Sequence, residues 1–412
     1  MTYSRRRLLQ ALGLGAAGLG ACAPAPRDVD DPEATSFSFA SWTLNEEAGK
    51  PVVQGLLDKA SSRDGLTING IPYPYNEYLD QLTLRVRGGT LVGAAQLDIA
   101  WLGALASLGT LRDLGPAAAG GGYTRTALAS GQYDGKQLGL PWTTGAIGLV
   151  SNKDLLERAG ISAPPRSIED SEAALAELRG LGVVPYAAQL KDIVVWMQTF
   201  GCTLLEGDEV TIGDEASVDA VTWYKKLYDQ KLIAPGVGRF DARALFGQGR
   251  AAIYDDAIVG KGAVVADSPD KELADKLDPL ARPVLAPGDS PRALLWGHVI
   301  VVIEGAAANT ATSLARWLTS DDEATSTFFE KLALPPATER GLASDAMVSD
   351  PYTKAFSERV TASATPSPFW KFPAYARMEA VVAEQVQAVL IGSASPADAM
   401  RTAGQGVQAL IT

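Results

Sequence analysis

The side chains of this chain that are best suited to chemistry are tryptophans with carboxylates, amides and hydroxyls beside them. The chain contains eight tryptophans. Two of them, Trp223 and Trp317, follow the spacing of a helix core, and the other six lie at predicted strand ends, turns or helix starts. Aromatic rings pack against the weakly polar C–H faces of a polyhydroxylated molecule, and polar groups bond its hydroxyls. The pattern predicts non-covalent capture of a polar ligand rather than catalysis.

The predicted ligand-binding residues form clusters along the chain. They are Trp42, Asn45 and Glu46; Asp98 and Trp101; Trp142, Thr143 and Thr144; Trp196; Asp255 and Asp256; Trp296, Gly297 and His298; and Phe369 and Trp370. For each aromatic side chain, the alternative is packing in a core or beneath a neighbouring helix, and Asp98 is equally suited to capping the turn that follows it.

The adjacent acids Asp255 and Asp256 follow a predicted strand and leave three possibilities open. They can accept hydrogens from the hydroxyls of a sugar, or from the nitrogen of a polyamine or amino sugar. They can also be compared with the paired carboxylates of a glycoside hydrolase. Nothing else in the sequence indicates hydrolysis, so capture of a ligand is the preferred interpretation.

Composition excludes several other functions. The formal charge is −12, which is unfavourable for binding nucleic acid. The chain has one histidine, His298, and two cysteines, Cys22 and Cys202. A zinc site or a histidine-based catalytic triad would therefore lack parts, and we expect neither a metal nor a cofactor.

The N-terminus has the order of a bacterial export signal. Arg5, Arg6 and Arg7 precede an apolar run that ends in small residues and Cys22. The ending resembles a lipoprotein cleavage site, which predicts a signal peptide over residues 1–21 and lipidation of Cys22. The residues around the arginines also resemble a twin-arginine signal. Residues 22–36 are rich in proline and acids and read as a flexible tether.

The mature chain alternates predicted strands and helices. Strands near 37–40, 66–72 and 97–101 are separated by helices near 46–60 and 76–87, which indicates a parallel α/β arrangement. Ser167, Asp214 and Asp321 are placed to cap later helices. The segment 138–150 is long and extended, 295–303 lies in a long strand or strand pair, and 334–338 interrupts the chain with prolines.

Four segments in this order resemble the family of extracellular solute-binding proteins of ABC importers, in the branch that mostly binds sugars. They are YNEYLDQLTLRVRGG with LDIAWL, YDGKQLGLPWTTGAIGLVSNKDLLERAGISAPPRS, LFGQGRAAIYDD, and the stretch from LLWGHVIVVIEG to LALPPAT. The chain departs from the family where Asp256-Ala257-Ile258 replaces a Gly-Pro-aromatic sequence. This departure removes a stacking ring expected from that loop.

The resemblance implies an α/β, two-lobed fold of the periplasmic-binding-protein type, with a doubly wound sheet in each lobe. Lobe I would comprise 37–142 and 298–333, lobe II 146–294 and 338–412, and the hinge 143–145, 295–297 and 334–337. It also implies capture of a mono- or oligosaccharide between the lobes and its delivery to a membrane permease. The expected protein is a monomeric lipoprotein on the outer face of the cytoplasmic membrane.

Overall fold

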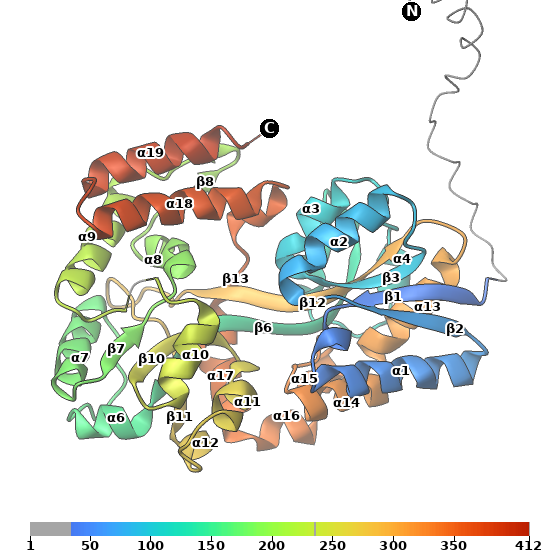
Figure 1. Ribbon diagram of the computed structural model, residues 1–412, viewed down its shortest axis with the longest axis horizontal. Coiled ribbons are helices and arrows are strands. Elements are labelled where there is room, and N and C mark those ends of the chain that lie inside the picture. The colour runs from blue at the N-terminus through green and yellow to red at the C-terminus, as the bar shows by residue number, and fades with distance from the viewer. Residues whose placement is uncertain (1–33, 235, 412) are drawn as a thin grey trace, which may run out of the picture.

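A mixed nine-stranded sheet runs through the whole molecule and joins two groups of helices (Figure 1). The computed structural model describes residues 34–234 and 236–411. The strand order is β2-β1-β3-β12-β6-β10-β7, with β11 paired to β6 and β13 paired to β12. We call the elements around β1–β3 the N-terminal lobe and those around β7, β10 and β11 the C-terminal lobe.

The strands are β1 (Ser36–Ser41), β2 (Thr67–Pro72), β3 (Gly93–Asp98), β4 (Gln132–Tyr133), β5 (Lys136–Gln137), β6 (Gly139–Asn152), β7 (Val184–Ala187), β8 (Leu205–Glu206), β9 (Glu209–Val210), β10 (Ala251–Ala257), β11 (Leu277–Leu280), β12 (Ala293–Ile303) and β13 (Ala364–Thr365). The α-helices are α1 (Gly49–Asp64), α2 (Tyr75–Arg87), α3 (Leu102–Ala106), α4 (Gly115–Ala118), α5 (Arg125–Ser130), α6 (Lys153–Arg158), α7 (Ile168–Gly180), α8 (Ile193–Thr199), α9 (Glu215–Asp229), α10 (Arg239–Gly247), α11 (Gly260–Ala266), α12 (Leu273–Lys276), α13 (Ala308–Ser320), α14 (Asp322–Leu332), α15 (Glu339–Leu342), α16 (Asp345–Ser349), α17 (Pro351–Arg359), α18 (Tyr375–Leu390) and α19 (Pro396–Gln408). Short 3₁₀ turns include η1 (Thr43–Asn45), η2 (Ile99–Trp101), η3 (Leu190–Asp192) and η5 (Pro368–Lys371).

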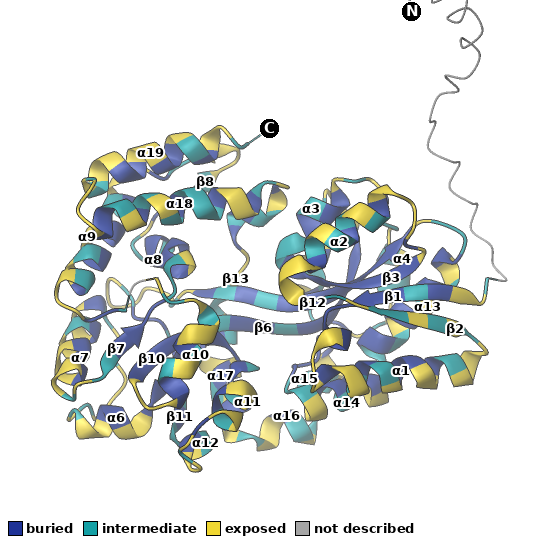
Figure 2. Cartoon of the chain, in the orientation of Figure 1, coloured by how far each residue is buried: buried dark blue, intermediate teal, exposed yellow. Residues whose placement is uncertain are grey.

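The N-terminal lobe is built on a parallel trio of strands, in which β1 pairs with both β2 and β3. Because side chains alternate along a strand, the two faces of β1 feed two cores. Phe37 and Phe39 pack with α1, α13 and α14, whereas Ala40 packs with α2 and α3. The buried interior of the sheet and the exposed outer faces of the helices are visible in Figure 2.

Two long strands, β6 and β12, connect the lobes. They pair antiparallel with each other from Gly139 to Ile147. The second half of β12, from His298 to Ile303, also pairs with β3 of the N-terminal lobe, and the end of β6 pairs with β10 and β11 of the C-terminal lobe. The register shifts between His298 and Val299, so a bulge lies where the chain leaves one lobe for the other.

The C-terminal lobe also covers both faces of its sheet. Helices α7, α8, α9, α18 and α19 bury one large core, and α10, α11 and α17 bury another on the opposite face. Helices α18 and α19 pack side by side at the outer end of this lobe (Figure 1). The strands β6 and β12 thus connect two lobes, each with its own helices and strands.

Several predicted boundaries differ from the structure. The predicted tether reaches residue 36, but Thr67 donates to the Thr35 carbonyl, Thr310 Oγ1 donates to the Ala34 carbonyl, and Ser36 already begins β1. The strand expected near 97–101 ends at Asp98, because the Asp98 side chain accepts the Ala100 N–H and starts the turn η2. The predicted signal peptide and the lipidation site at Cys22 lie outside the described residues.

The start of α7 provides a local test of the fold. Ser167 accepts the N–H of Asp170, and Asp170 accepts the N–H of Ser167, so both ends of this capping box are formed. We expect Ser167→Ala to lower the free energy of unfolding by about 1 kcal/mol, and Ser167→Asp to lower it by a few tenths at most. Urea denaturation measures both. Equal stability of all three proteins would show that this cap contributes nothing.

Candidate functional site

The lobes meet at two tryptophans, Trp101 and Trp370. Each is half-buried, and each packs against the cores of both lobes. The backbones are also close there, since a Cβ atom added to Gly103 of α3 would lie 2.4 Å from the Trp370 carbonyl oxygen. Both tryptophans were predicted as ligand-binding residues. We call the polar and aromatic side chains around them the interlobe cluster.

The N-terminal side of this cluster is an aromatic group centred on Trp42. The Trp42 ring meets Tyr75, Tyr78, Trp101 and His298 edge-on, with ring centroids 4.8–5.5 Å apart. Trp42 itself is buried, and the other rings of the group pack around it. Tyr75, which the sequence analysis did not single out, is 43% exposed and forms the outer surface of the group.

Asp98 lies at the edge of this aromatic group. It accepts hydrogen bonds from the Tyr75 hydroxyl at 3.2 Å and from the Ala100 N–H at 3.0 Å. Burial raises the pKa of Asp98 to about 6, against the smaller opposing effect of these bonds. Asp98 ends β3 instead of lying inside a strand that continues to Trp101, and its side chain performs the capping that the sequence analysis gave as the alternative.

The C-terminal side is provided by α18. Tyr375 and Glu379 are four residues apart and therefore share one face of this helix. Glu379 accepts a hydrogen bond from Trp370 Nε1 at 3.2 Å. Burial raises the pKa of Glu379 to about 7. The Trp370 bond and the charge of Lys191 oppose this shift, and the charges of Asp192 and of Asp98 in the other lobe add to it. Burial also raises the pKa of Tyr375, as does the charge of Asp98, whereas its interaction with Trp101 lowers it.

A second polar layer lies behind α18 in the C-terminal lobe. Asp192, at the end of η3, pairs with Arg239 at 3.3 Å, and Arg239 also donates to the Asp255 carbonyl at 2.8 Å. Burial raises the pKa of Asp192 to about 6, although Arg239 opposes the shift. Arg239 also lowers the pKa of Tyr75 in the opposite lobe, which burial raises.

The predicted pair Asn45 and Glu46 is exposed at the end of η1. Desolvation by the surrounding protein nevertheless raises the pKa of Glu46, and Arg243 of the C-terminal lobe lowers it. Glu46 thus faces the other lobe from a solvent-accessible position.

The adjacent acids Asp255 and Asp256 differ from the prediction. Both lie inside β10 rather than after it, so their side chains point to opposite faces of the sheet. Asp255 pairs with Arg282 at 2.7 Å, and Asp256 pairs with Arg243 through two bonds of 2.7 and 2.8 Å. The two carboxylates are buried and neutralised. They do not form a paired acid site, and neither is free to accept a ligand amine.

Trp196 and Arg282 belong to the network around Asp255. The Tyr186 hydroxyl donates to Asp255, and Trp196 Nε1 donates to the Tyr186 hydroxyl at 3.4 Å. The Arg282 guanidinium lies 4.5 Å from the Trp196 ring centroid. The predicted ligand-stacking ring of Trp196 is therefore buried within the lobe and holds a cation of the protein itself.

Two other predicted site residues lie in hydrophobic cores. Trp142 is 1% exposed and stacks on Phe328 with centroids 4.0 Å apart, because its side chain projects to the α14 face of β6. Phe369 is fully buried in the core beneath α18. Because side chains alternate along a strand, Trp142 points into the core while its neighbour on β6 points the other way. In the proline-bounded turn η5, Phe369 points into the core and the next residue, Trp370, lies at the lobe interface.

The predicted hinge residues form the joint between β6 and β12. Thr143 Oγ1 accepts the N–H of His298 at 3.1 Å, and Thr144 donates to the Pro335 carbonyl at 3.1 Å. A Cβ atom added to Gly297 would lie 2.4 Å from the Thr143 carbonyl oxygen, so glycine permits this close approach. The half-buried Trp296 ring packs beside Gly145 and His298.

His298 is a buried structural histidine. Its Nδ1 is 3.1 Å from Gln96 Nε2, which donates to it and leaves the proton of the neutral ring on Nε2. Burial lowers the pKa of His298 to about 3. This low pKa makes His298 unsuited to exchanging protons near neutral pH.

The depressed pKa of His298 predicts a loss of stability in acid. The unfolded chain binds a proton below about pH 6.5 and the folded chain does so only below about 3, so stability is complete above 6.5 and falls as the pH drops. The slope due to this residue is about 1.4 kcal/mol per pH unit. We expect His298→Gln to flatten the dependence of urea-denaturation stability between pH 6.5 and 4. Parallel curves for the two proteins would contradict the assignment.

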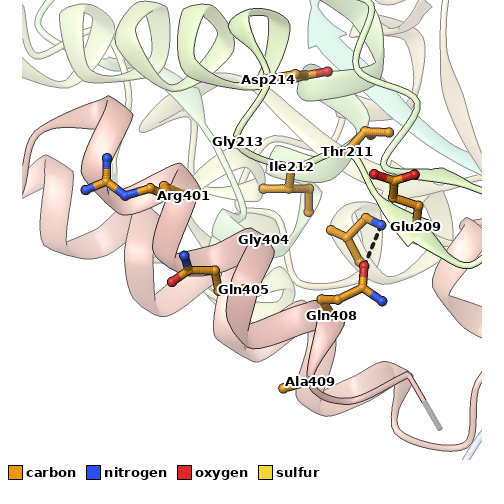
Figure 3. Close-up of a pocket in the computed structure, with 11 residues that line it drawn as sticks. Glu209, Thr211, Ile212, Gly213, Asp214, Arg401, Gly404, Gln405, Gln408 and Ala409 are labelled. Carbon is orange, nitrogen blue, oxygen red and sulfur yellow. Dashed lines mark hydrogen bonds between the residues drawn. The ribbon is translucent and has the colours of Figure 1, made fainter.

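Other features of the described residues do not provide an alternative candidate site to the interlobe cluster. Within 34–234 and 236–411, no group of three or more histidine, cysteine, aspartate or glutamate side chains is arranged to hold a metal ion. In the same part of the chain, no helix is both long and apolar enough to cross a membrane. A surface groove of about 670 Å³ lies between β9 and α19, where Gln408 accepts the Val210 N–H (Figure 3). It is lined by none of the residues of the interlobe cluster.

Sequence reasoning missed the contributions of Tyr75, Asp192, Arg239, Tyr375 and Glu379. One signal was present: Tyr375 and Glu379 lie at i and i+4 of a helix that follows Trp370 closely. The chain segments that meet at the cluster are far apart in sequence, and only the packing of α18 against η3 and η5 brings them together.

The two lobes, their two connecting strands and the interlobe cluster define a two-lobed binding-protein fold. Residues 55–355 match the family model described as bacterial extracellular solute-binding protein. The chain therefore belongs to the bacterial extracellular solute-binding protein family, as its resemblance predicts.

Similar proteins agree with this assignment. Binding proteins of Brucella abortus (strain 2308) and Brucella suis biovar 1 (strain 1330) are each 28% identical over 204 residues, which is 46% of this chain. The chain spans about half the length of these curated relatives. The GacH receptor of Streptomyces glaucescens GLA.O, whose structures include complexes with acarbose, superimposes with a TM-score of 0.80 at 22% identity over 92% of this chain and 98% of that one. The maltose-bound MalE3 of T. maritima gives 0.78 at 20% identity, over 92% and 100%. These structures confirm the predicted α/β two-lobed fold.

Proposed function

We propose that this protein captures a carbohydrate, a mono- or oligosaccharide, between its two lobes and delivers it to the permease of an ABC importer. The observation that carries the proposal is the interlobe cluster, in which Trp101 and Trp370 pack against both lobes beside Asp98 and Glu379. Aromatic faces for C–H groups and buried polar groups for hydroxyls are what a sugar requires. The ligands of GacH and MalE3 support the same class.

The proposed mechanism is capture without chemistry. The open protein samples the solute, and both lobes then close on it about residues 143–145, 295–297 and 334–337. The Gly297–Thr143 approach and the bulge after His298 give this joint a defined geometry. The closed form presents both lobes to the permease. No observation favours a glycoside hydrolase, because Asp255 and Asp256 are each occupied by an arginine.

The proposal includes the cellular location. The family is extracellular, and the N-terminal sequence supports export and lipidation of Cys22 by a bacterial lipoprotein pathway. A lipid anchor and the segment that follows it would hold a monomeric receptor near its permease and raise its effective concentration there. Metabolic labelling with a fatty acid of the intact chain and of Cys22→Ser tests this part independently of the ligand.

A thermal-shift screen of the purified protein with neutral and amino sugars tests the ligand class. A ligand that binds only the folded form at 100 times its Kd adds about 2.7 kcal/mol to the free energy of unfolding. We expect at least one saccharide to raise the melting temperature. A panel of mono-, di- and oligosaccharides that produces no shift would reject carbohydrate as the ligand class.

A further inference from the structure

Two carboxylates of the interlobe cluster, Asp98 and Glu379, form no ion pair with any residue of 34–234 or 236–411. Asp98 accepts bonds only from the Tyr75 hydroxyl and the Ala100 N–H, and Glu379 only from Trp370 Nε1. They come from opposite lobes, and the charge of Asp98 acts on Glu379. Closure of the lobes on an empty site would therefore oppose two like charges with little water between them.

Every other buried carboxylate of this region is neutralised by an arginine. Asp192 pairs with Arg239, Asp255 with Arg282 and Asp256 with Arg243. This is the ordinary requirement for a buried charge. The exposed Lys191 lowers the pKa of Glu379 from a distance but forms no hydrogen bond with it in the described structure. Among the described residues, no lysine or arginine is thus ion-paired with Asp98 or Glu379.

Aromatic side chains adjoin both carboxylates and favour a cationic occupant, because aromatic faces attract cations. The Tyr75 hydroxyl bonds Asp98 and its ring packs against Trp101, and Trp370 bonds Glu379. The Tyr224 hydroxyl, on a residue that is 1% exposed, has no hydrogen-bond partner and is under the influence of the Asp192 and Asp255 charges. Nη1 of the buried Arg282 also has no partner. Both atoms lie in the buried network around Asp255 inside the C-terminal lobe.

We propose that the captured carbohydrate carries a basic nitrogen, as in an amino or imino sugar, and that its ammonium group lies between Asp98 and Glu379. The inference rests on the proposed function and names its substrate class. The nitrogen supplies the missing positive charge, and the rings of Trp101 and Trp370 contact the C–H faces of the sugar. The hydroxyls bond the polar groups on either side.

The titration of the cluster supports this assignment and supplies a second readout. The groups that act on Asp98 or Glu379 are Tyr75 from the N-terminal lobe and Lys191, Asp192 and Trp370 from the C-terminal lobe. Tyr375 is affected by both carboxylates and by Trp101, and Arg239 acts on Tyr75 and Asp192. With the pKa of Glu379 near 7 and that of Asp98 near 6, both carboxyls are partly protonated at pH 6.5. An arriving cation lowers both pKa values, so its binding releases protons.

Matched saccharide pairs test the proposal by titration calorimetry at pH 6.5 in two buffers of different ionisation enthalpy. Glucosamine is compared with glucose, and the β-1,4-linked glucosamine disaccharide with cellobiose, which differ only in amine against hydroxyl. For any neutral saccharide found in the screen, its amino derivative completes a further pair. We expect the amine member of a pair to bind at least tenfold more tightly and to release protons.

Single variants distinguish the effect of removing a carboxylate charge from the effect of disturbing the fold. Asp98→Asn and Glu379→Gln should each reduce the amine preference to less than threefold and reduce proton release, because only one of the two titrating carboxyls remains. Glu384→Gln, on the same helix but exposed and paired with Arg377, should change neither. Melting temperatures show which variants are folded. If a neutral saccharide binds as tightly as its amine partner without proton release, the proposal is overturned while carbohydrate capture stands. If no saccharide of either kind binds, both fail.

Discussion

Arg282→Met is expected to lower the free energy of unfolding by about 3–5 kcal/mol, because it leaves the carboxylate of Asp255 buried without a counter-charge. Both side chains are almost completely inaccessible, at 1% and 0%, and their closest atoms are 2.7 Å apart. The variant also loses the bond to the Arg292 carbonyl and the contact with the Trp196 ring. Urea denaturation followed by tryptophan fluorescence measures the loss.

The matched control is Arg401→Met. Arg401 pairs with Asp398 on α19, but both side chains are more than half exposed, so we expect a change within about 0.5 kcal/mol. If Arg282→Met is too unstable to purify, the double variant Asp255→Asn with Arg282→Met keeps the test decisive, since it removes the buried charge and should recover part of the loss. An Arg282→Met protein as stable as the parent would contradict the buried pair.

Trp142→Ala and Trp101→Ala are expected to have opposite effects. Trp142 fills the N-terminal core against Phe328 and Phe39, so its truncation should cost about 3–5 kcal/mol of stability. Trp142→Phe provides a milder variant that should remain folded. Because the Trp142 ring lies away from the interlobe cluster, the folded fraction of either variant should bind its ligand normally.

Trp101→Ala should instead weaken binding at least tenfold, about 1.4 kcal/mol, with a smaller loss of stability, since the Trp101 ring is only half-buried at the lobe interface. Denaturation and calorimetry on the same preparations separate the two effects. Loss of affinity in Trp142→Phe, with Trp101→Ala unaffected, would reverse the assignment of core and site.

The fold could be predicted because its signals are local. Ser167, Asp214 and Asp321 cap α7, α9 and α14 as expected, since an N-cap needs only a short polar side chain and the next turn of helix. The long extended segments that became β6 and β12 were visible from their composition. The ordered resemblance over four segments then supplied the family.

The site could be predicted only in part, because it depends on which way side chains point and on what is opposite them. The sequence places Asp255 and Asp256 together, but it does not show that Arg282 and Arg243 neutralise them on opposite faces of β10. It shows Trp142 and Phe369 near the lobe connection, but not that they point inward. Glu379 becomes prominent only once Trp370 and Asp98 are known to lie beside it.

The central claim is that a carbohydrate binds between the lobes at the interlobe cluster. Titration calorimetry of the parent protein, Trp101→Ala and the core-helix control Trp317→Ala, with the best saccharide of the screen, tests it most directly. The account predicts one-to-one binding to the parent, at least tenfold weaker binding to Trp101→Ala, and an unchanged Kd for Trp317→Ala. A saccharide that binds the parent and Trp101→Ala equally well would place the site elsewhere and contradict the account.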